Sequence, residues 1–157
     1  MRIGFGYDSH RFVSGRKLIL AGQVIPFAKG LAGHSDADAV AHALIDGMLG
    51  AAGAGNIGTL FPDTDPQWKD ADSMSLLRTA YGVVSGRGFH LAQADISIII
   101  ERPRLAPYVV AMSRALAEAC GISERDISVK AKTNEGMGFV GRGEGIAVMA
   151  VVLLEAS

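Results

Sequence analysis

The chain has 157 residues, of which 49% are hydrophobic and 20% charged, and it carries a formal net charge of -1. This length suits one domain over residues 1–157. The near-zero charge offers no general attraction for nucleic acid or an anionic membrane. A single cysteine, Cys120, excludes an internal disulfide. The longest apolar run, Ile146 to Leu154, is too short to cross a bilayer, and the N-terminus lacks the sections of a signal peptide, so we expect a cytoplasmic protein.

The first half of the chain predicts a strand, a hairpin and a helix, in that order. Residues Arg2 to His10 alternate small or aromatic side chains with others, which is typical of a strand that ends in polar residues. The run from Lys17 to Pro26 indicates a hairpin of two short strands. An amphipathic helix is expected from about Ala37 to Ala51, with Ser35 and Asp36 as its capping residues.

The second half begins with a loop rich in Gly, Pro and Asp, from Gly53 to Pro66, and then alternates helices with strands. The expected elements are a helix over Ser73–Ser85, a strand over Ala94–Ile100, a helix over Pro107–Cys120, and strands over Ile127–Lys132 and Ile146–Leu154. Together they predict an α+β fold, a single-domain α/β sandwich in which helices cover one face of a mixed sheet.

The last strand, Ile146 to Leu154, is apolar on both of its alternating faces. Three helices can cover only one face of the sheet, so we expect the other face to pack against another subunit. The alternative is an internal strand that its own chain wraps on both sides.

A group of acids and histidines forms a candidate metal site. Asp8 and His10 are two apart on a strand and so point the same way, while Asp38, His42 and Asp46 recur at intervals of four along a helix. Asp8, His10 and His42 would leave one coordination position open, as in catalytic zinc sites and related divalent sites. Either Asp38 or Asp46 is expected to accept the second ring N–H of His42. The alternative is an exposed stripe of weak ion pairs.

Two segments contain groups that could hold phosphate. His34 and Ser35 precede the first helix, where backbone N–H groups and the helix dipole favour an anion, although a simple cap explains them equally well. The run KAKTNEGMGFVGRGEG places Lys132, Thr133 and Arg142 among five glycines that allow close backbone approach. Its GxGxxG is followed by a strand, not a helix, which excludes a Rossmann site, and the chain has no P-loop or nucleophile elbow.

Four runs of the sequence carry a resemblance to a known family: GYDSH, HSDADAVAHALIDGMLGAAGAGNIGTLFPDTDP, IIIERPRLAP and VKAKTNEGMGFVGRGEGIA. Together they resemble the 2-C-methyl-D-erythritol 2,4-cyclodiphosphate synthase family over essentially the whole chain. The resemblance implies a homotrimer with active sites between subunits and with its sheets turned toward the threefold axis. The implied reaction converts 4-diphosphocytidyl-2-C-methyl-D-erythritol 2-phosphate to the cyclic diphosphate. The 2-phosphate attacks the β-phosphorus and CMP is released, in the methylerythritol phosphate pathway to isoprenoid precursors.

The resemblance also implies roles for individual residues. Zinc is held by Asp8, His10 and His42, and a magnesium or manganese ion on the substrate diphosphate by Glu135. The transition state is stabilised by two further residues, His34 and Thr133. The implied substrate-binding residues are Asp8, Ser9, His10, His34, Ser35, Asn56, Ile57, Gly58, Phe61, Pro62, Asp63, Thr64, Asp65, Ile100, Pro103, Arg104, Leu105, Ala106, Lys132, Thr133, Asn134, Glu135, Phe139 and Arg142.

Within that set, residues 56–58 and 61–65 are implied to cradle the erythritol, and residues 100–106 and 132–135 the cytidine. Phe139 and Arg142 match residues that line a cavity on the trimer axis, where the family can hold an isoprenoid diphosphate with its anionic head at Arg142. Asn56 departs from the family pattern, which commonly has aspartate there, and so loses a charge while keeping an acceptor.

The residues taken without the resemblance leave two other classes open. One is a mononuclear metal hydrolase or a non-haem iron oxygenase, because both use one carboxylate and two histidines. The other is a trimeric binding protein that uses zinc only for folding.

Overall fold

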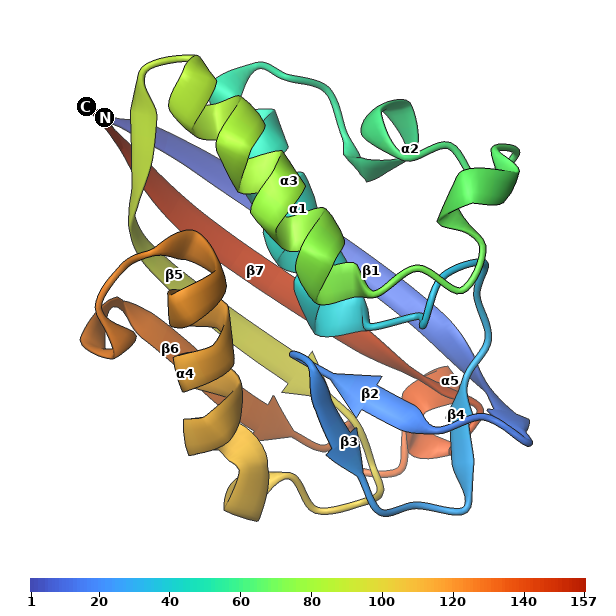
Figure 1. The fold of residues 1–157 in the computed structure, drawn as a ribbon. Coiled ribbons are helices and arrows are strands. Elements are labelled where there is room, and N and C mark those ends of the chain that lie inside the picture. The colour runs from blue at the N-terminus through green and yellow to red at the C-terminus, as the bar shows by residue number, and fades with distance from the viewer.

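A five-stranded mixed sheet with helices on one face forms the body of the structure, a computed structural model that describes all 157 residues (Figure 1). The strands are β1 (Arg2–Ser14), β2 (Leu18–Leu20), β3 (Gln23–Ile25), β4 (Lys29–Leu31), β5 (Phe89–Ile99), β6 (Ile127–Lys132) and β7 (Gly145–Ala156). The helices are α1 (Ala39–Ala52), α2 (Ile57–Leu60), α3 (Ser73–Gly86), α4 (Val109–Cys120) and α5 (Gly138–Gly141). None of these helices has both the length and the hydrophobicity needed to cross a lipid bilayer.

The strand order is β4-β1-β7-β5-β6, and only the β5–β6 pair is parallel. β1 and β7 pair antiparallel along nearly their whole length, from Arg2 opposite Leu154 to Arg11 opposite Gly145, which brings the two termini together (Figure 1). The β2–β3 hairpin forms a separate two-stranded sheet, as expected. The α+β class and the one-sided helical layer predicted from the sequence are confirmed.

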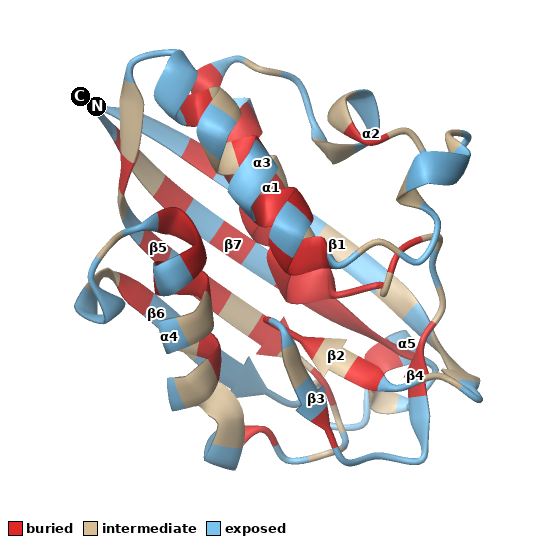
Figure 2. Cartoon of the chain, in the orientation of Figure 1, coloured by how far each residue is buried: buried red, intermediate tan, exposed pale blue.

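The buried core lies between the sheet and α1, which packs on β1 and β7 and is itself covered by α3 (Figures 1 and 2). Two glycines of β1 make this contact unusually close. A Cβ added at Gly4 would lie 1.9 Å from the carbonyl oxygen of Gly47, and one added at Gly6 would lie 1.8 Å from that of Ala43. The backbone of α1 therefore rests directly on the backbone of β1.

The opposite face of the sheet is apolar and uncovered within one chain. Ile3 and Phe5 of β1 are 74% and 61% exposed, and Val151 of β7 is 48% exposed, whereas the residues between them face α1 and are buried. Figure 2 shows this alternation along the strands. β7 is thus apolar on both faces, as predicted, and its outer face lacks a partner in the single chain.

The start of α1 differs from the prediction. Ala37 has a φ of 59°, which is left-handed, so the helix cannot include it and begins at Ala39. The cap is Asp38, whose carboxylate accepts the backbone N–H groups of Val40 and Ala41, and the expected caps, Ser35 and Asp36, lie outside the helix.

Several other bounds also differ. β1 continues past His10 to Ser14, where it pairs with β4, a three-residue strand that the sequence did not suggest. β5 begins at Phe89, five residues before the strand expected at Ala94, and α4 begins at Val109 after a short turn.

Candidate active site

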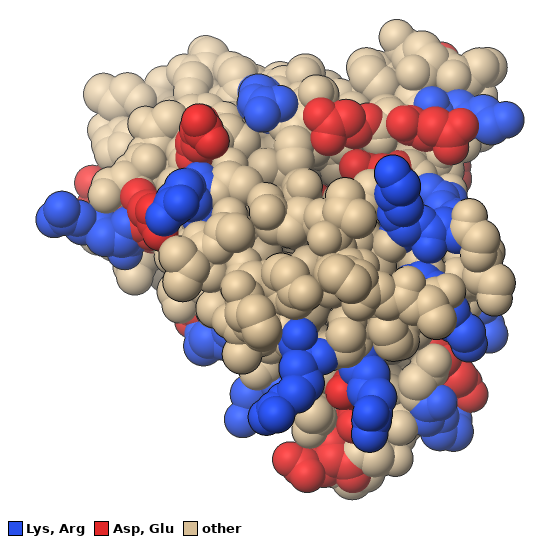
Figure 3. All heavy atoms as spheres, turned by 60° about the horizontal axis from the view of Figure 1, so that its bottom comes forward, with Lys and Arg blue, Asp and Glu red and all other residues tan.

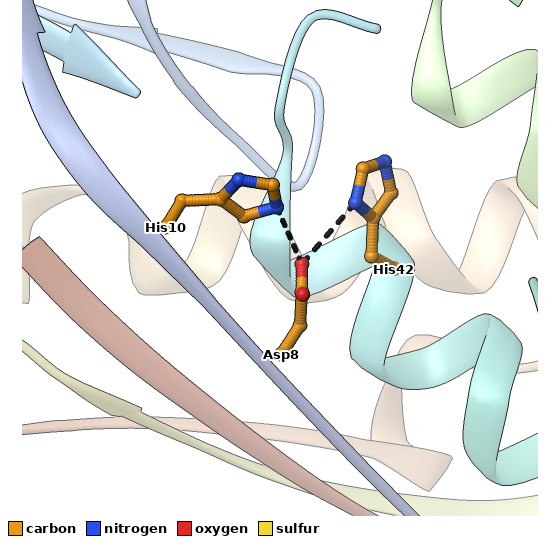
Figure 4. A group of neighbouring side chains, drawn as sticks. All are labelled: Asp8, His10 and His42. Carbon is orange, nitrogen blue, oxygen red and sulfur yellow. Dashed lines mark hydrogen bonds and ion pairs between the residues drawn. The ribbon is translucent and has the colours of Figure 1, made fainter. Parts of the chain in front are cut away.

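Asp8, His10 and His42 converge on one point, as the sequence predicted (Figure 4). Asp8 and His10 follow Gly4 and Gly6 on the face of β1 that packs against α1, and α1 supplies His42. Asp8 Oδ2 lies 2.8 Å from His10 Nε2 and 3.2 Å from His42 Nδ1. The three candidate ligand atoms all lie within 4.8 Å of one another. One carboxylate oxygen and two imidazole nitrogens are therefore available to a single cation.

The far nitrogen of each imidazole has its own partner. His10 Nδ1 lies 2.6 Å from the carbonyl oxygen of Ala32, and because a carbonyl only accepts, Nδ1 carries the hydrogen. In the neutral ring this leaves a lone pair on His10 Nε2, a buried atom that makes no hydrogen bond of good geometry. His42 Nε2 lies 2.8 Å from Ser73 Oγ, so that Nδ1 faces Asp8. Both rings are thus oriented to present one nitrogen to the shared point.

The charges of this cluster are interdependent. Burial alone would raise the pKa of Asp8, but its contacts with His10 and His42 outweigh burial and lower that pKa below its usual range. Burial alone would lower the pKa of His10, but Asp8 and the Ala32 carbonyl outweigh it and raise that pKa. The cluster therefore attracts positive charge, and a divalent cation would compete with a proton for it.

The expected role of Asp38 and Asp46 beside His42 is wrong. Asp38 is fully buried, where it accepts the backbone N–H groups of Ala21 and Gly22 at 2.8 Å each as well as capping α1, and burial raises its pKa to about 6. Asp46 instead accepts the N–H of Ile57 at 2.7 Å. An interval of four residues fixes the helix face but not the side-chain partner, and both carboxylates pair with backbone outside the site. The residue that does contact His42 Nε2, Ser73, was not predicted.

A pocket of about 420 Å³ opens beside the cluster. It is lined by His10, Gly33, His34, Ser35, His42, Ile57, Gly58, Phe61, Pro62, Asp63, Trp68 and Leu76. Most of these were expected at the erythritol and phosphate end of a site. His34 Nε2 lies 3.3 Å from the carbonyl oxygen of Asp65. Asn56 caps α2 by accepting the backbone N–H of Thr59 at 2.9 Å, so its side-chain oxygen is used locally, while Thr64 is exposed in the same loop.

A second pocket, of about 560 Å³, shares no residue with the first. Its lining comprises Ile100, Glu101, Pro103, Arg104, Leu105, Ala106, Val109, Val129, Lys130, Ala131, Lys132 and Thr133. Next to it, Glu135 has a φ of 53° in the turn after β6. Glu101, which the sequence did not single out, accepts the N–H of Asn134 at 2.6 Å and so fixes that turn.

The remaining predicted residues lie around α5. Ser9 and Phe139 line a pocket of about 240 Å³ together with His10, Arg11 and Glu144. Arg142 Nε donates to Glu144 Oε1 at 2.9 Å, and this exposed pair raises the pKa of Arg142 and lowers that of Glu144. Figure 3, which brings the lower end of Figure 1 forward, shows Lys and Arg side chains in small groups around an uncharged centre, with acids among them. Because the net charge is near zero, an anionic ligand would depend on such local groups of basic side chains.

Comparisons with known proteins agree with the fold described above. The model of the YgbB family matches residues 1–155. A 2-C-methyl-D-erythritol 2,4-cyclodiphosphate synthase of Moorella thermoacetica is 58% identical over 154 residues, covering 98% of this chain and 94% of the relative. A solved structure of such a synthase in a CDP-bound form has a TM-score of 0.90 and 42% identity, over 98% of this chain and all of the other. A bifunctional IspDF of Campylobacter jejuni has a TM-score of 0.96 and 45% identity over 99% of this chain, which spans 42% of that longer protein.

Proposed function

The chain belongs to the YgbB family and catalyses the reaction of its 2-C-methyl-D-erythritol 2,4-cyclodiphosphate synthases, and we propose that Asp8, His10 and His42 bind zinc in that reaction. The enzyme is a phosphorus–oxygen lyase of isoprenoid precursor biosynthesis. An oxygen of the substrate 2-phosphate forms a bond to the β-phosphorus, and the bond from that phosphorus to the CMP oxygen breaks. No atom of the protein becomes bonded to the substrate, so catalysis depends on positioning and on charge stabilisation.

The convergence of Asp8, His10 and His42 is the observation on which the zinc proposal rests. Two imidazoles and one carboxylate with an open position suit zinc, and the buried Nε2 of His10, which lies 2.8 Å from Asp8 Oδ2 without a hydrogen bond of good geometry, is what a metal ligand would present. A zinc ion held there would act as a Lewis acid toward a phosphate oxygen. A magnesium or manganese ion on the diphosphate is assigned to Glu135, which is exposed on the turn that Glu101 fixes.

The protein's own groups then orient the two reacting phosphates. His34 and Ser35 line the pocket beside the metal ligands, where they would bind and polarise phosphate oxygens. Thr133 and Lys132 line the second pocket, where Lys132 would neutralise charge on the diphosphate and Thr133 would donate to a transferring oxygen.

A complete site needs two subunits. The pocket with the metal ligands and the pocket with Lys132 share no residue, and the resemblance assigns the two ends of one substrate to them. The exposed apolar side chains of β1 and β7, among them Ile3, Phe5 and Val151, supply a face that a second copy would bury. We therefore assign a homotrimer, with cytidine bound by residues 100–106 and 132–135 of one subunit beside the metal of its neighbour.

Two further assignments follow from the same family membership. Phe139 and Arg142 would line a cavity on the trimer axis, and Arg142 would meet the head of an isoprenoid diphosphate there. The enzyme is assigned to the cytoplasm, where the other small soluble metabolites of such a pathway are available.

Phosphorus NMR of the purified protein tests the reaction directly. With the diphosphocytidyl substrate and magnesium, we expect stoichiometric CMP and a cyclic diphosphate, and no inorganic phosphate. The variant His42→Ala should form neither product, while His90→Ala, a histidine outside both pockets that lies 3.9 Å from Glu155, should turn over as the parent does. Release of inorganic phosphate or of an open-chain diphosphate would identify a hydrolase instead.

A further inference from the structure

Ser73, which is buried, and Asp36, which is partly buried, form a hydrogen-bonded chain behind His42, on the side away from Asp8. His42 Nε2 lies 2.8 Å from Ser73 Oγ, and Ser73 Oγ in turn donates to Asp36 Oδ1. Asp36 Oδ2 accepts the backbone N–H of Ser73 at 3.1 Å. The Asp36 carboxylate therefore holds Ser73 at two points, its backbone N–H and its hydroxyl.

The chemistry of these groups settles where the hydrogens lie. A carboxylate only accepts, so the single hydroxyl hydrogen of Ser73 is directed to Asp36. Ser73 Oγ can then only accept from His42, which means that His42 Nε2 carries a hydrogen. In the neutral ring the unprotonated nitrogen is therefore Nδ1, the one that lies 3.2 Å from Asp8 Oδ2. The contact pattern selects one tautomer and one ring orientation.

Asp8 opposes this tautomer when no metal is bound. A carboxylate 3.2 Å from His42 Nδ1 would attract a hydrogen to that nitrogen, and an Nδ1–H group cannot bind a metal. The chain from Asp36 through Ser73 offers the competing acceptor on the other side of the ring. The hydrogen bond from Ser73 to Asp36 is stronger than one between neutral groups, because its acceptor is a carboxylate.

Ser73 cannot act on the substrate itself. It is fully buried, at 0% exposure, and it does not line the pocket beside the metal ligands. Ser35 Oγ also lies near His42 Nε2, at 3.2 Å, but it accepts the N–H of Ala37 and lines that pocket. Ser73 Oγ is thus the nearer partner of His42 Nε2, while the Ser35 hydroxyl, which also lies 3.5 Å from Ser73 Oγ, is at the wall of the pocket.

We infer that Ser73, backed by Asp36, is a positioning residue that holds His42 in the tautomer and orientation required for zinc binding. This inference rests on the zinc site proposed above. Supporting groups of this kind change metal affinity by about 10- to 100-fold when they are removed. The alternative is that Ser73 serves only to start α3, where it follows the cap residue Asp72.

Zinc affinity, measured by competition with a chromophoric chelator, distinguishes these readings without use of turnover. We expect Ser73→Ala to bind zinc about 10- to 100-fold more weakly than the parent. Ser75→Ala is the matched control, because Ser75 Oγ donates to Asp72 in the same helical turn, is exposed, and does not touch His42. It should bind zinc as the parent does.

A second readout is the ¹⁵N NMR spectrum of the metal-free protein at about pH 8, where histidine side chains are mostly neutral. The parent should show His42 protonated at Nε2, and Ser73→Ala should shift that hydrogen toward Nδ1. If Ser73→Ala does not fold, Asp36→Asn replaces it, since it keeps the size and one acceptor but removes the charge, and a several-fold loss of affinity is expected.

The outcomes separate the inference from the zinc site itself. A parent protein that binds no zinc would refute the proposed site. If the parent binds zinc and Ser73→Ala binds within twofold of it, or Ser75→Ala weakens binding equally, the positioning role is overturned. In the event that only Asp36→Asn folds, unchanged affinity in that variant overturns it in the same way.

Discussion

The variant Gly6→Ala tests whether the close approach of α1 to β1 builds the metal site. The added Cβ would lie 1.8 Å from the carbonyl oxygen of Ala43 and 2.8 Å from the backbone nitrogen of Gly47, and both are backbone atoms that no rotamer change can move. In proteins, Cβ atoms essentially never lie closer than 3.0 Å to the heavy atoms of residues distant in the chain. The helix must therefore retreat from the strand by roughly 1 Å.

That retreat acts on stability and on zinc binding by separate routes. Overpacking of a close-packed interior costs about 1–3 kcal/mol of unfolding free energy, and the contact here is with rigid backbone. His42 precedes Ala43 in the chain and moves with it, whereas Asp8 follows Gly6 on the strand. Zinc sites tolerate only about 0.2 Å of change in ligand distances, so affinity should fall by at least tenfold.

Urea unfolding of the metal-free protein, at one fixed protein concentration, measures the first effect, and chelator competition measures the second. Gly50→Ala is the matched control, since it lies in α1 as well, has no neighbour within 4 Å of an added Cβ, and should stabilise by about 0.5–1 kcal/mol. If Gly6→Ala kept both the stability and the zinc affinity of the parent, the geometric reasoning would be refuted.

Four further changes have defined outcomes. His42→Ala should purify without zinc, as measured by elemental analysis, and normal zinc content would remove it from the site. Lys132→Ala should raise KM for the diphosphocytidyl substrate by about tenfold through the lost phosphate contact, and unchanged steady-state constants would exclude that contact. Val151→Asp should yield monomers in sedimentation velocity, because a charge would be buried unpaired between subunits, and an intact trimer would contradict the assigned interface. Zinc affinity should fall as the pH falls, by about tenfold per pH unit for each proton that zinc displaces. The fall should begin above the ordinary histidine pKa, because the pKa of His10 is raised, and a flat affinity profile from pH 8 to 6 would contradict this prediction.

The sequence predicted the convergence of Asp8 and His10 because strand periodicity alone places the two side chains on one face. His42 was included for its residue type and helical stripe, and nothing in the pattern indicated how close its helix would lie. That distance depends on Gly4 and Gly6, because glycine has no side chain and α1 can therefore pack directly on the backbone of β1. A glycine in a strand can signal close backbone approach, and this is the signal that could have been used.

The errors have a common origin in local competition for hydrogen bonds. Asp38 was assigned to His42 from spacing, but a buried carboxylate at a helix start is better satisfied by backbone N–H groups, of which it accepts four. Ser73 was missed because it lies more than thirty positions from His42, and only the tertiary packing of α3 on α1 joins them. The short elements β4 and α2 have too few residues to show a period.

Most residues that line the pockets of about 420 and 560 Å³ were named through the family resemblance, not through periodicity or spacing. The two pockets share no residue, Ser9 and Phe139 line a third, and Glu101 is an additional support of the 134–136 turn. No sequence pattern indicates how the exposed face of the sheet is covered, and in the proposed trimer this would decide which pocket of one copy faces which pocket of the next.

Anomalous diffraction at the zinc absorption edge, from crystals grown with zinc and CDP, tests the central claim most directly. We expect one zinc peak per subunit at about 2.0–2.2 Å from Asp8 Oδ2, His10 Nε2 and His42 Nδ1, with the diphosphate of CDP between it and the 132–135 turn of a neighbouring copy. A peak bound by other atoms, or CDP bound with both of its ends in pockets of a single chain, would contradict the account.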